Sequence, residues 1–346
     1  MINRILKAFN KRIKRLPIFR VKKNLNPVRW GIIGLGNMAE KFSTAIDGNK
    51  NGIVYAVASR DKKKALMFGK RHNCSHAYGS YQEMLQDDKL KLDVVYISTP
   101  VKYHYENIKQ CLLSGKNVLC EKPICSTSKQ LEELINLAKA KNCFLMEGMW
   151  TKCLPSFCKG KEWESLIGKK ELIKIDFYKR ELICPEQTIF NAAEGGGVLK
   201  DYGVYAISFA TSFLESLPKK LIAHSRQSSF KIDSDWQIYA ENNGVQAFIS
   251  LSSNFDSLSK ASVIGTEGTI EWNSQFNRTN VITLYDNKGK QLDKFVANYE
   301  YDGFEYELNE VQKCIKEGKK ESTLVPLIES LNTLKVIDLI TKSHHE

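Results

Sequence analysis

A short glycine turn near the start of the chain is the stretch best suited to binding a phosphate group. It reads Gly34-x-Gly36-x-x-Ala39 and lies between the apolar residues 30–35 and a helical pattern. In such a strand-to-helix turn, the first glycine permits the tight bend and the second lets a pyrophosphate approach the backbone at the helix N-terminus. Ala39 is small enough for the helix to pack on its strand. The flanking strand and helix favour a dinucleotide site over a purely structural turn.

The end of the next expected strand, residues 52–58, indicates which dinucleotide is bound. An NAD-selective site places an acid here, where it accepts hydrogen bonds from both ribose hydroxyls. This chain has Ser59 and Arg60 instead, and a guanidinium is a rigid bidentate partner for a 2′-phosphate. Asp61 fits the N-cap of the following helix. We therefore expect NADP rather than NAD; the alternative is that Arg60 is a solvated loop residue.

A third strand ends at the same edge of the expected sheet. Residues 93–98 are apolar and β-branched without alternation, as in a parallel strand that is covered on both faces, and they lead into Thr99-Pro100. Ligands of open α/β sheets bind at this carboxyl edge. His104 opens the next helical pattern. As a lone histidine, it is better explained as a packing or capping group than as a catalyst.

The strand at residues 117–120 delivers a charged pair to this edge, because Glu121-Lys122-Pro123 follows it directly. Lysine is a poor acid in water, but desolvation and nearby cations lower its pKa toward useful values. Lys122 is therefore a candidate for proton chemistry.

A second candidate group lies in the other half of the chain, on the helix expected from Val198. Asp201 and Tyr205 are four residues apart, so both project from one face of that helix. A tyrosine beside a lysine can exchange a proton at a carbinol carbon, with the cation stabilising the phenolate. Taken alone, the Asp–Tyr pair is better explained as a capping or core contact.

Strand and helix alternate over residues 28–150, which predicts an α/β unit with a doubly wound parallel sheet. After residue 150 the pattern changes to alternating apolar and polar segments between 221 and 295, separated by turn signals such as Asn242-Asn243-Gly244. These segments predict an antiparallel sheet, and helical patterns at 304–317 and 326–341 close the chain. We expect a leader at 1–27, a dinucleotide-binding domain at 28–150 and a substrate and oligomerisation domain at 151–342.

The charge of the chain is concentrated in its leader. Ten of the Lys and Arg residues and none of the acids lie before residue 30, so the remainder carries a net charge of only +2 out of +12. The nearly neutral body argues against a nucleic-acid-binding enzyme domain. Apolar residues of 1–20 fall at helical spacing, which fits an amphipathic helix on an anionic membrane surface, but a disordered or poorly packed basic leader is the favoured interpretation. The leader lacks the apolar core of a signal peptide.

Cysteine and histidine usage argues for a reducing compartment and against a metal site. No run of eighteen apolar residues is present, and the histidines form no HxH or HxxxH pair. We expect a cytoplasmic protein without disulfides or a metal. The nine cysteines are scattered without CxxC spacing: Cys74, Cys111, Cys120, Cys125, Cys143, Cys153, Cys158, Cys184 and Cys314.

Several stretches together resemble the glucose–fructose oxidoreductase and inositol dehydrogenase-like family, often called Gfo/Idh/MocA, over roughly residues 28–342. Methionine, glutamate and tryptophan in MEGMW, and tyrosine at 205, resemble the branch that holds dimeric dihydrodiol dehydrogenases and NADP-dependent D-xylose 1-dehydrogenases. The matching stretches are WGIIGLGNMAEKF, VASRD, DVVYISTPVKYHYENIKQCLLSGKNVLCEKP, MEGMW, GGGVLKDYGVY, VIGTEGTIEW and GFEYELNEV.

The resemblance implies a Rossmann domain followed by an α+β domain, whose large, mostly antiparallel open sheet serves as a homodimer or homotetramer surface. It implies that Lys122 and Tyr205 are the catalytic pair and that Asp201 supports them. Tyr205 would be the general acid/base, Lys122 would lower its pKa, and the Lys122–Pro123 bond would be cis, as it often is in relatives. Substrate would contact Lys122, Trp150, Asp201 and Tyr205. The cofactor would contact Gly34, Gly36, Asn37, Met38, Ser59, Arg60, Thr99, Pro100, His104, Glu121 and Lys122.

The expected function is an NADP-dependent oxidoreductase that acts on a small sugar, polyol or cyclic diol. A nucleotide-sugar dehydrogenase or reductase of cell-surface glycan synthesis is the alternative, and a non-catalytic dinucleotide sensor is a third hypothesis. The chain departs from the family at residues 185–194, which lack an arginine and FDP, and at Glu321-Ser322-Thr323 in place of ESP. Lys200 and Tyr202 add polar bulk to the catalytic helix. These departures bear on the substrate rather than on the reaction type.

Overall fold

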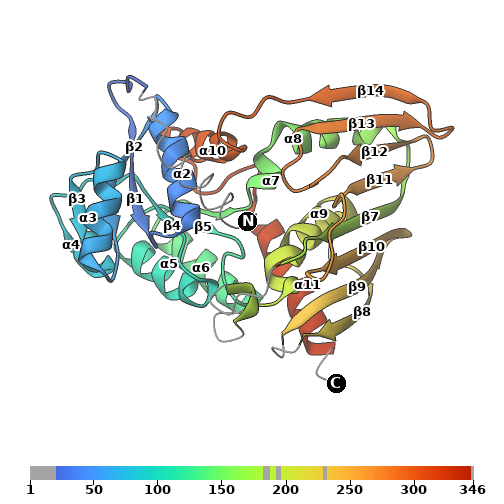
Figure 1. Cartoon of the computed structure of the whole chain (residues 1–346), viewed down its shortest axis with the longest axis horizontal. Coiled ribbons are helices and arrows are strands. Elements are labelled where there is room, and N and C mark those ends of the chain that lie inside the picture. Colours follow the sequence, from blue (N-terminus) through green and yellow to red (C-terminus); the bar gives the residue numbers. More distant parts are fainter. Residues whose placement is uncertain (1–20, 182–187, 192–195, 229–231, 344–346) are drawn as a thin grey trace, which may run out of the picture.

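The computed structural model describes residues 21–181, 188–191, 196–228 and 232–343. The described chain forms two β-sheets that lie side by side, with helices packed between and around them (Figure 1). The sequence-based expectations for residues 1–20, Cys184 and most of the departing stretch 185–194 fall outside the described residues.

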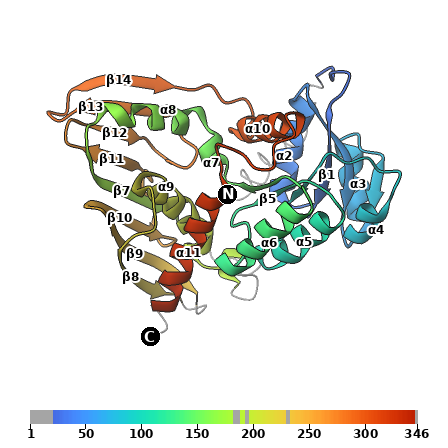
Figure 2. The same cartoon turned by 180° about the vertical axis from the view of Figure 1, so that it is seen from behind.

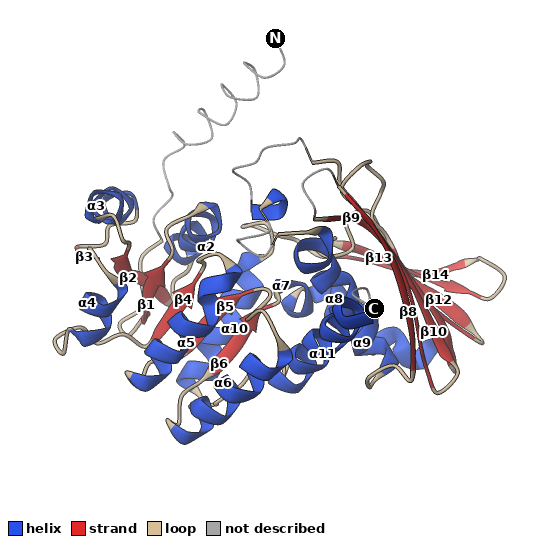
Figure 3. Ribbon diagram, turned by 90° about the horizontal axis from the view of Figure 1, so that it is seen from below, coloured by secondary structure: helices blue, strands red, loops and turns tan. Residues whose placement is uncertain are grey.

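The first sheet has six parallel strands in the order β3-β2-β1-β4-β5-β6. In Figure 3 it lies between α2 on one side and α5 and α6 on the other. Strands β4, β5 and β6 are buried along their whole length, which explains why their sequences lack alternation. The elements are β1 Val28–Ile33, α2 Asn37–Gly48, β2 Gly52–Ala58, α3 Lys62–Arg71, β3 His76–Tyr78, α4 Tyr81–Gln86, β4 Val94–Ile97, α5 His104–Leu113, β5 Val118–Glu121, α6 Ser128–Ala140 and β6 Leu145–Gly148.

The second sheet has eight strands in the order β14-β13-β12-β11-β7-β10-β9-β8. Its neighbours are antiparallel except β7 and β10, which pair in parallel. The alternation seen in the sequence reflects a sheet with one covered and one open face, and an α/β unit followed by this mostly antiparallel sheet is the expected fold class. The strands are β7 Lys170–Tyr178, β8 Lys220–Gln227, β9 Asp233–Asn242, β10 Val245–Ser252, β11 Ala261–Gly265, β12 Gly268–Trp272, β13 Val281–Asp286 and β14 Gln291–Val296.

Helices α8 (Pro155–Trp163), α9 (Val204–Leu214) and α11 (Leu327–Ser343) cover the face of the second sheet that looks toward the first (Figure 3). Seen from behind, α5 and α6 lie along the first sheet and α11 along the second (Figure 2). The aromatic core between α9 and β12 includes Phe209 and Trp272, whose ring centroids are 4.8 Å apart at 89°. The covered face is thus a conventional apolar core.

Two helices join the sheets. Helix α10 (Phe304–Lys316) packs on α2 and on α7 (Trp150–Cys153), while α11 packs on α6. The α6–α11 contact is polar: the Ser128 amide donates to Asp338 at 2.9 Å, and Lys335 pairs with Glu132 at 2.9 Å. These contacts fix the position of the second sheet relative to the carboxyl edge of the first.

The helix expected from Val198 does not begin as a regular α-helix. Residues Leu199–Gly203 form a π-helical turn, and α9 starts only at Val204. Asp201 therefore lies in the wider turn and Tyr205 in the first turn of α9. Such π-turns are rare and occur mostly at functional sites.

Candidate active site

A large cleft lies where the carboxyl ends of the first sheet meet the loops of the second, and its volume is about 850 Å³. One wall contains the turns after β1, β4 and β5. The other contains the π-turn, the segment after β7, and the loops that follow β10 and β12. The cleft therefore has one wall from each half of the chain, as an enzyme needs if it is to bring a cofactor and a substrate together.

The glycine turn fits a pyrophosphate. Gly34 has φ +87°, and a Cβ atom there would lie 2.6 Å from the Thr99 backbone nitrogen, so the tight bend requires glycine. Gly36 lines the cleft, and a Cβ atom there would meet nothing within 4 Å, which leaves open space in front of the helix. Helix α2 has no side-chain cap at Gly36. Its first backbone N–H groups are therefore available to an anion.

The end of β2 has the polarity expected for a 2′-phosphate. Asp61 caps α3 by accepting hydrogen bonds from the Lys63 and Lys64 amides, as its position in the sequence predicts. Its carboxylate is thus engaged at the helix rather than free for a ribose. Arg60 is exposed, and its guanidinium lies 5.6 Å from the centroid of the Tyr103 ring. The buried Ser59 accepts a hydrogen bond from the Asp61 amide at 3.2 Å.

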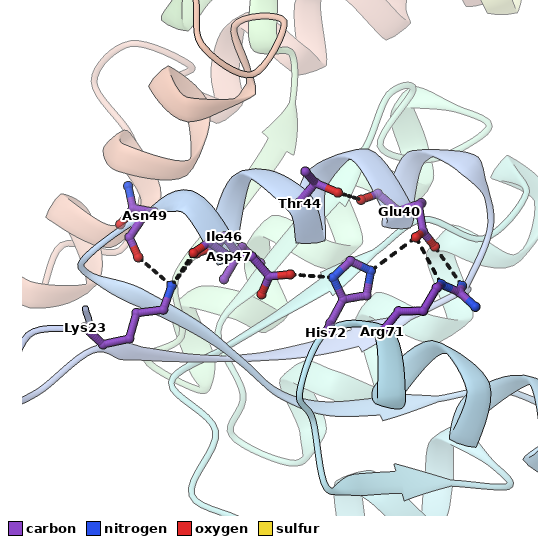
Figure 4. A network of polar contacts seen from close by, with 8 residues as sticks. All are labelled: Lys23, Glu40, Thr44, Ile46, Asp47, Asn49, Arg71 and His72. Atoms are coloured by element: carbon purple, nitrogen blue, oxygen red, sulfur yellow. Dashed lines mark hydrogen bonds and ion pairs between the residues drawn. The ribbon is translucent and has the colours of Figure 1, made fainter. Parts of the chain in front are cut away.

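A buried histidine ties the two cofactor-side helices together (Figure 4). His72, just after α3, places Nδ1 2.7 Å from Asp47 Oδ2 and Nε2 3.5 Å from Glu40 Oε1, both on α2. Burial lowers the pKa of His72, but hydrogen bonds to both carboxylates outweigh burial and raise it above its ordinary value. Lys23 donates to three carbonyls at the other end of α2, at 2.7 to 2.9 Å. Helix α2 is thus held at both ends.

The turn after β4 is braced from two sides. Ser98 donates from Oγ to the Gly34 carbonyl at 2.7 Å, which links the β1 and β4 turns. The His104 ring bridges the carbonyls of Pro123 at 2.9 Å and Thr99 at 2.6 Å. Burial lowers the pKa of His104, and a neutral ring donates to only one of them. His104 lines the cleft, but these contacts give it the packing role that the sequence favoured.

Lys122 and Asp201 meet across the cleft. Lys122 Nζ lies 2.7 Å from Asp201 Oδ1 and 2.9 Å from the Asp201 carbonyl, and the Lys122–Pro123 bond is cis. Burial alone would lower the pKa of Lys122, but the Asp201 carboxylate and the Tyr205 phenol raise it above its ordinary value. The expectation that desolvation lowers this pKa is therefore wrong, because the carboxylate partner outweighs it.

Tyr205 completes the set. Its ring centroid is 4.7 Å from Lys122 Nζ, and only 8% of the residue is exposed. Burial raises the pKa of the Tyr205 phenol, and Lys122 acts in the opposite direction without cancelling it. Within the described residues, nothing hydrogen-bonds the phenol oxygen, so it can bond to a ligand in the cleft.

The floor of the cleft contains a second group of buried residues. Trp150 lines the cleft and stacks on Phe304, with ring centroids 4.6 Å apart at 29°. Glu121 is buried and accepts a hydrogen bond from Tyr96 at 2.5 Å, and burial raises the pKa of its carboxyl.

The structure brings most of the expected site residues to the cleft. Gly36, Met38, Thr99, Pro100, His104, Glu121, Lys122, Trp150, Asp201 and Tyr205 line it. Gly34, Asn37, Ser59 and Arg60 are not in its lining, although they lie in or next to the turns that form it. The sequence interpretation missed several residues of the lining. Lys41, Ser98 and Phe304 lie within stretches that carry the family resemblance but were not predicted as site residues, and Asp256, Asn277 and Arg278 lie outside those stretches. Among the described residues there is no cluster of three groups that could hold a metal ion.

A dinucleotide-binding turn, a cleft at the carboxyl edge of a parallel sheet and a lysine–aspartate–tyrosine set together define a nicotinamide-dependent oxidoreductase. The family model described as "Oxidoreductase family, NAD-binding Rossmann fold" matches residues 28–149, and the "GFO/IDH/MocA C-terminal domain" matches residues 164–271. The chain belongs to the Gfo/Idh/MocA oxidoreductase family.

The sequence match to curated relatives extends over nearly the whole chain. The trans-1,2-dihydrobenzene-1,2-diol dehydrogenase of Xenopus laevis is 32% identical over 326 residues, which cover 90% of this chain and 96% of that protein. The enzyme of the same name from Homo sapiens is 28% identical over 326 residues and covers 91% of this chain and 96% of its own.

Solved structures show the same fold. A 3-ketoreductase from Actinomadura kijaniata, in complex with NADP and TDP-benzene, has a TM-score of 0.80 at 24% identity, over 92% of this chain and 98% of its own. An aldose-aldose oxidoreductase from Caulobacter crescentus, complexed with glycerol, has a TM-score of 0.82 at 20% identity, over 92% and 98%. In the described part of this chain, no helix has the length and apolar character needed to cross a membrane.

Proposed function

We propose that this protein is an NADP-dependent oxidoreductase that interconverts a carbinol and a carbonyl carbon on a sugar, polyol or cyclic diol. The observation that carries the proposal is the Lys122–Asp201 pair beside Tyr205, opposite the glycine turn in one cleft. The curated dihydrodiol dehydrogenases support the diol and polyol class. The intact acid–base set speaks against a non-catalytic dinucleotide sensor.

The preference for NADP over NAD rests on Ser59 and Arg60. Ser59 stands where an NAD-selective site has an acid, and the nearby Asp61 carboxylate is engaged as the cap of α3. The Arg60 guanidinium is exposed beside Tyr103. Lys102 lies on the same Tyr103 ring, 4.8 Å from its centroid. Two cations around one exposed aromatic ring suit an adenosine that carries a 2′-phosphate.

In the proposed mechanism, the nicotinamide, when bound, would accept or donate the hydride. Lys122 binds the oxygen on the reacting carbon, and Asp201 keeps Lys122 charged and oriented. Tyr205 holds or receives the proton of that oxygen. Because burial raises the pKa of Tyr205, the phenol is protonated at neutral pH and suits proton donation during carbonyl reduction.

The test is a substrate panel in which NADPH absorbance reports turnover. Aldoses, polyols, trans-dihydrodiols and nucleotide sugars are assayed in both directions, and Lys122→Met is the matched blank for background reduction. We expect turnover of at least one polyhydroxylated class by the native enzyme and none by the variant. Equal rates in the two proteins would contradict the proposal.

The proposed assembly is a homodimer or homotetramer that forms through the open face of the second sheet. On that face Ile222, Tyr239 and Phe248 are register partners across β8, β9 and β10, and Ile222 and Phe248 are 56% and 48% exposed. An apolar row of this kind on an uncovered sheet suits self-association. The free thiols of the described residues support a reducing, cytoplasmic location.

A further inference from the structure

The charges that line the cleft do not balance. Six cations line it, against three acids: Lys41, Lys122, Lys179, Arg180, Lys200 and Arg278 against Glu121, Asp201 and Asp256. Among the acids, Glu121 is buried and already accepts a hydrogen bond from Tyr96. The cleft is therefore electropositive, although the chain after residue 30 is almost neutral.

The cations divide by the element that carries them. Lys41 is on α2, one turn beyond the phosphate-binding end of that helix, and so belongs to the cofactor side. Four others come from the second sheet and its connections: two directly after β7, one in the π-turn, and one in the loop between β12 and β13. These are Lys179, Arg180, Lys200 and Arg278. Their elements form the wall that faces the glycine turn, so a bound dinucleotide does not account for them.

Two of these four cations already have carboxylate partners. Lys179 contacts Glu181, and Arg180 lies 3.9 Å from Asp256. The Lys200 side chain makes no hydrogen bond or ion pair with any described residue. Within the described chain, the Arg278 guanidinium donates to the neutral side-chain amide of Gln275 and pairs with no carboxylate. The cleft thus contains a half-buried lysine and an arginine, and neither is paired with a carboxylate. Two such cations in one cleft are suited to bind an anion.

We propose that the substrate carries an anionic group, a carboxylate or a phosphate, away from its reacting carbon, and that Lys200 and Arg278 bind that group. This inference rests on the proposed oxidoreductase function and specifies its substrate class. The reacting carbon lies at Lys122 and Tyr205, and Lys200 is the immediate chain neighbour of Asp201. Binding of the remote anion would help to hold the carbon in place for hydride transfer.

The test compares matched neutral and anionic substrates: D-glucose, D-glucuronate, D-glucose 6-phosphate and UDP-glucose. Their kcat/KM values are measured from NADPH absorbance with the native enzyme, Lys200→Gln, Arg278→Gln and the control Lys288→Gln, whose lysine lies in the exposed β13–β14 turn. We expect an anionic member to be preferred over D-glucose. The anionic-to-neutral ratio should fall about tenfold to a hundredfold in the two cleft variants and stay constant in the control.

The arms of the panel identify the anion. Preference for D-glucuronate indicates a carboxylate, preference for D-glucose 6-phosphate a phosphomonoester, and preference for UDP-glucose a diphosphate. A native enzyme that prefers D-glucose, or cleft variants that keep the native ratio, would overturn the inference while leaving the oxidoreductase function intact.

Absence of turnover with every compound would instead count against the proposed function. In that case calorimetric binding of D-glucose 6-phosphate and D-glucuronate to the NADP-saturated protein decides the inference. Saturation is needed because it occupies the phosphate sites on the cofactor side. Binding that weakens tenfold or more in Lys200→Gln and Arg278→Gln, but not in Lys288→Gln, supports the anion site. Equal binding in all four proteins, or none in the native protein, overturns it.

Discussion

Lys122 Nζ lies 2.7 Å from Asp201 Oδ1, and this contact joins the end of β5 to the π-turn before α9. The two residues are far apart in the chain and belong to its two different halves, so their contact exists only when the halves are docked. Polar contacts between α6 and α11 and the packing of α10 on α2 hold that arrangement. The acid–base set is therefore a product of the whole fold.

Tyr205→Phe removes the proposed proton donor and leaves the ring in place. We expect kcat to fall by about 100-fold or more, because positioned general acids contribute roughly that factor. NADPH binding, followed by quenching of tryptophan fluorescence, should match that of the native protein. A variant that retains most of its turnover would show that the proton comes from another group.

Asp201→Asn tests the electrostatic role of the carboxylate. Asp201 raises the pKa of Lys122, whereas burial lowers it. With an amide in its place, burial dominates, so Lys122 should lose its proton at a lower pH than in the native enzyme. The alkaline limb of the pH profile for kcat/KM should accordingly move to lower pH. An unchanged limb would mean that the charge of Lys122 does not limit the reaction.

The first sheet could be predicted from the sequence because its signals are local. Strands covered on both faces must be continuously apolar, and the Gly34–Ala39 spacing marks the turn that follows β1. The parallel pairing of β7 with β10 could not be predicted, because α9, β8 and β9 separate the two strands in the chain. No local sequence pattern specifies which distant strands pair or in which register. The alternation over residues 221–295 predicted the antiparallel part of the second sheet, which the structure confirms, but not this parallel pair.

The residues of the candidate site could be predicted only where a sequence motif contains them. Lys122 and Tyr205 stand in recognisable stretches, whereas Arg278 enters the cleft from the unpatterned loop between β12 and β13 and could be found only in three dimensions. Phe304 is the first residue of α10, in a helical pattern that the sequence predicts, but nothing in that pattern marks it as a cleft residue. The direction of the Lys122 pKa could not be predicted either. It depends on the 2.7 Å contact with Asp201, which cancels the effect of burial.

Arg60→Ala tests the source of NADP selectivity. Loss of a charge-assisted contact to the 2′-phosphate should raise the Kd for NADPH by roughly tenfold to a hundredfold. NADH lacks that phosphate, so its Kd should change by less than about threefold and serves as the internal control. Equal effects on both dinucleotides would place Arg60 elsewhere, as a general contact to the adenosine or as a solvated loop residue.

Phe248→Lys tests the proposed assembly surface. Phe248 is 48% exposed, and its ring lies 5.2 Å from that of Tyr239 on the open face. A lysine at the centre of a buried interface would be an unpaired charge, so the variant should be a monomer by light scattering while the native protein is a dimer or tetramer. Lys288→Gln, in a turn at the edge of the sheet, should keep the native mass. A native monomer would refute the proposal.

His72→Gln tests the brace between α2 and α3. Because the pKa of His72 is raised above 6.5, the stabilisation that it provides is complete below pH 6.5 and disappears as pH rises through the folded value. Hydrogen bonding to His72 lowers the pKa of Glu40 to about 2. The stabilisation from Glu40 is therefore complete above pH 4.5 and is lost as pH falls toward 2.

The difference in Tm between native protein and variant should accordingly be largest between pH 4.5 and 6.5 and should shrink on either side. Loss of the buried contacts should cost about 1–3 kcal/mol in that window. Arg71→Gln removes the half-exposed ion pair with Glu40 and the guanidinium contacts with the Phe68 ring and the Met67 carbonyl, and it should cost less than about 1 kcal/mol. A Tm difference that does not vary with pH would show that His72 stabilises the helices by packing alone.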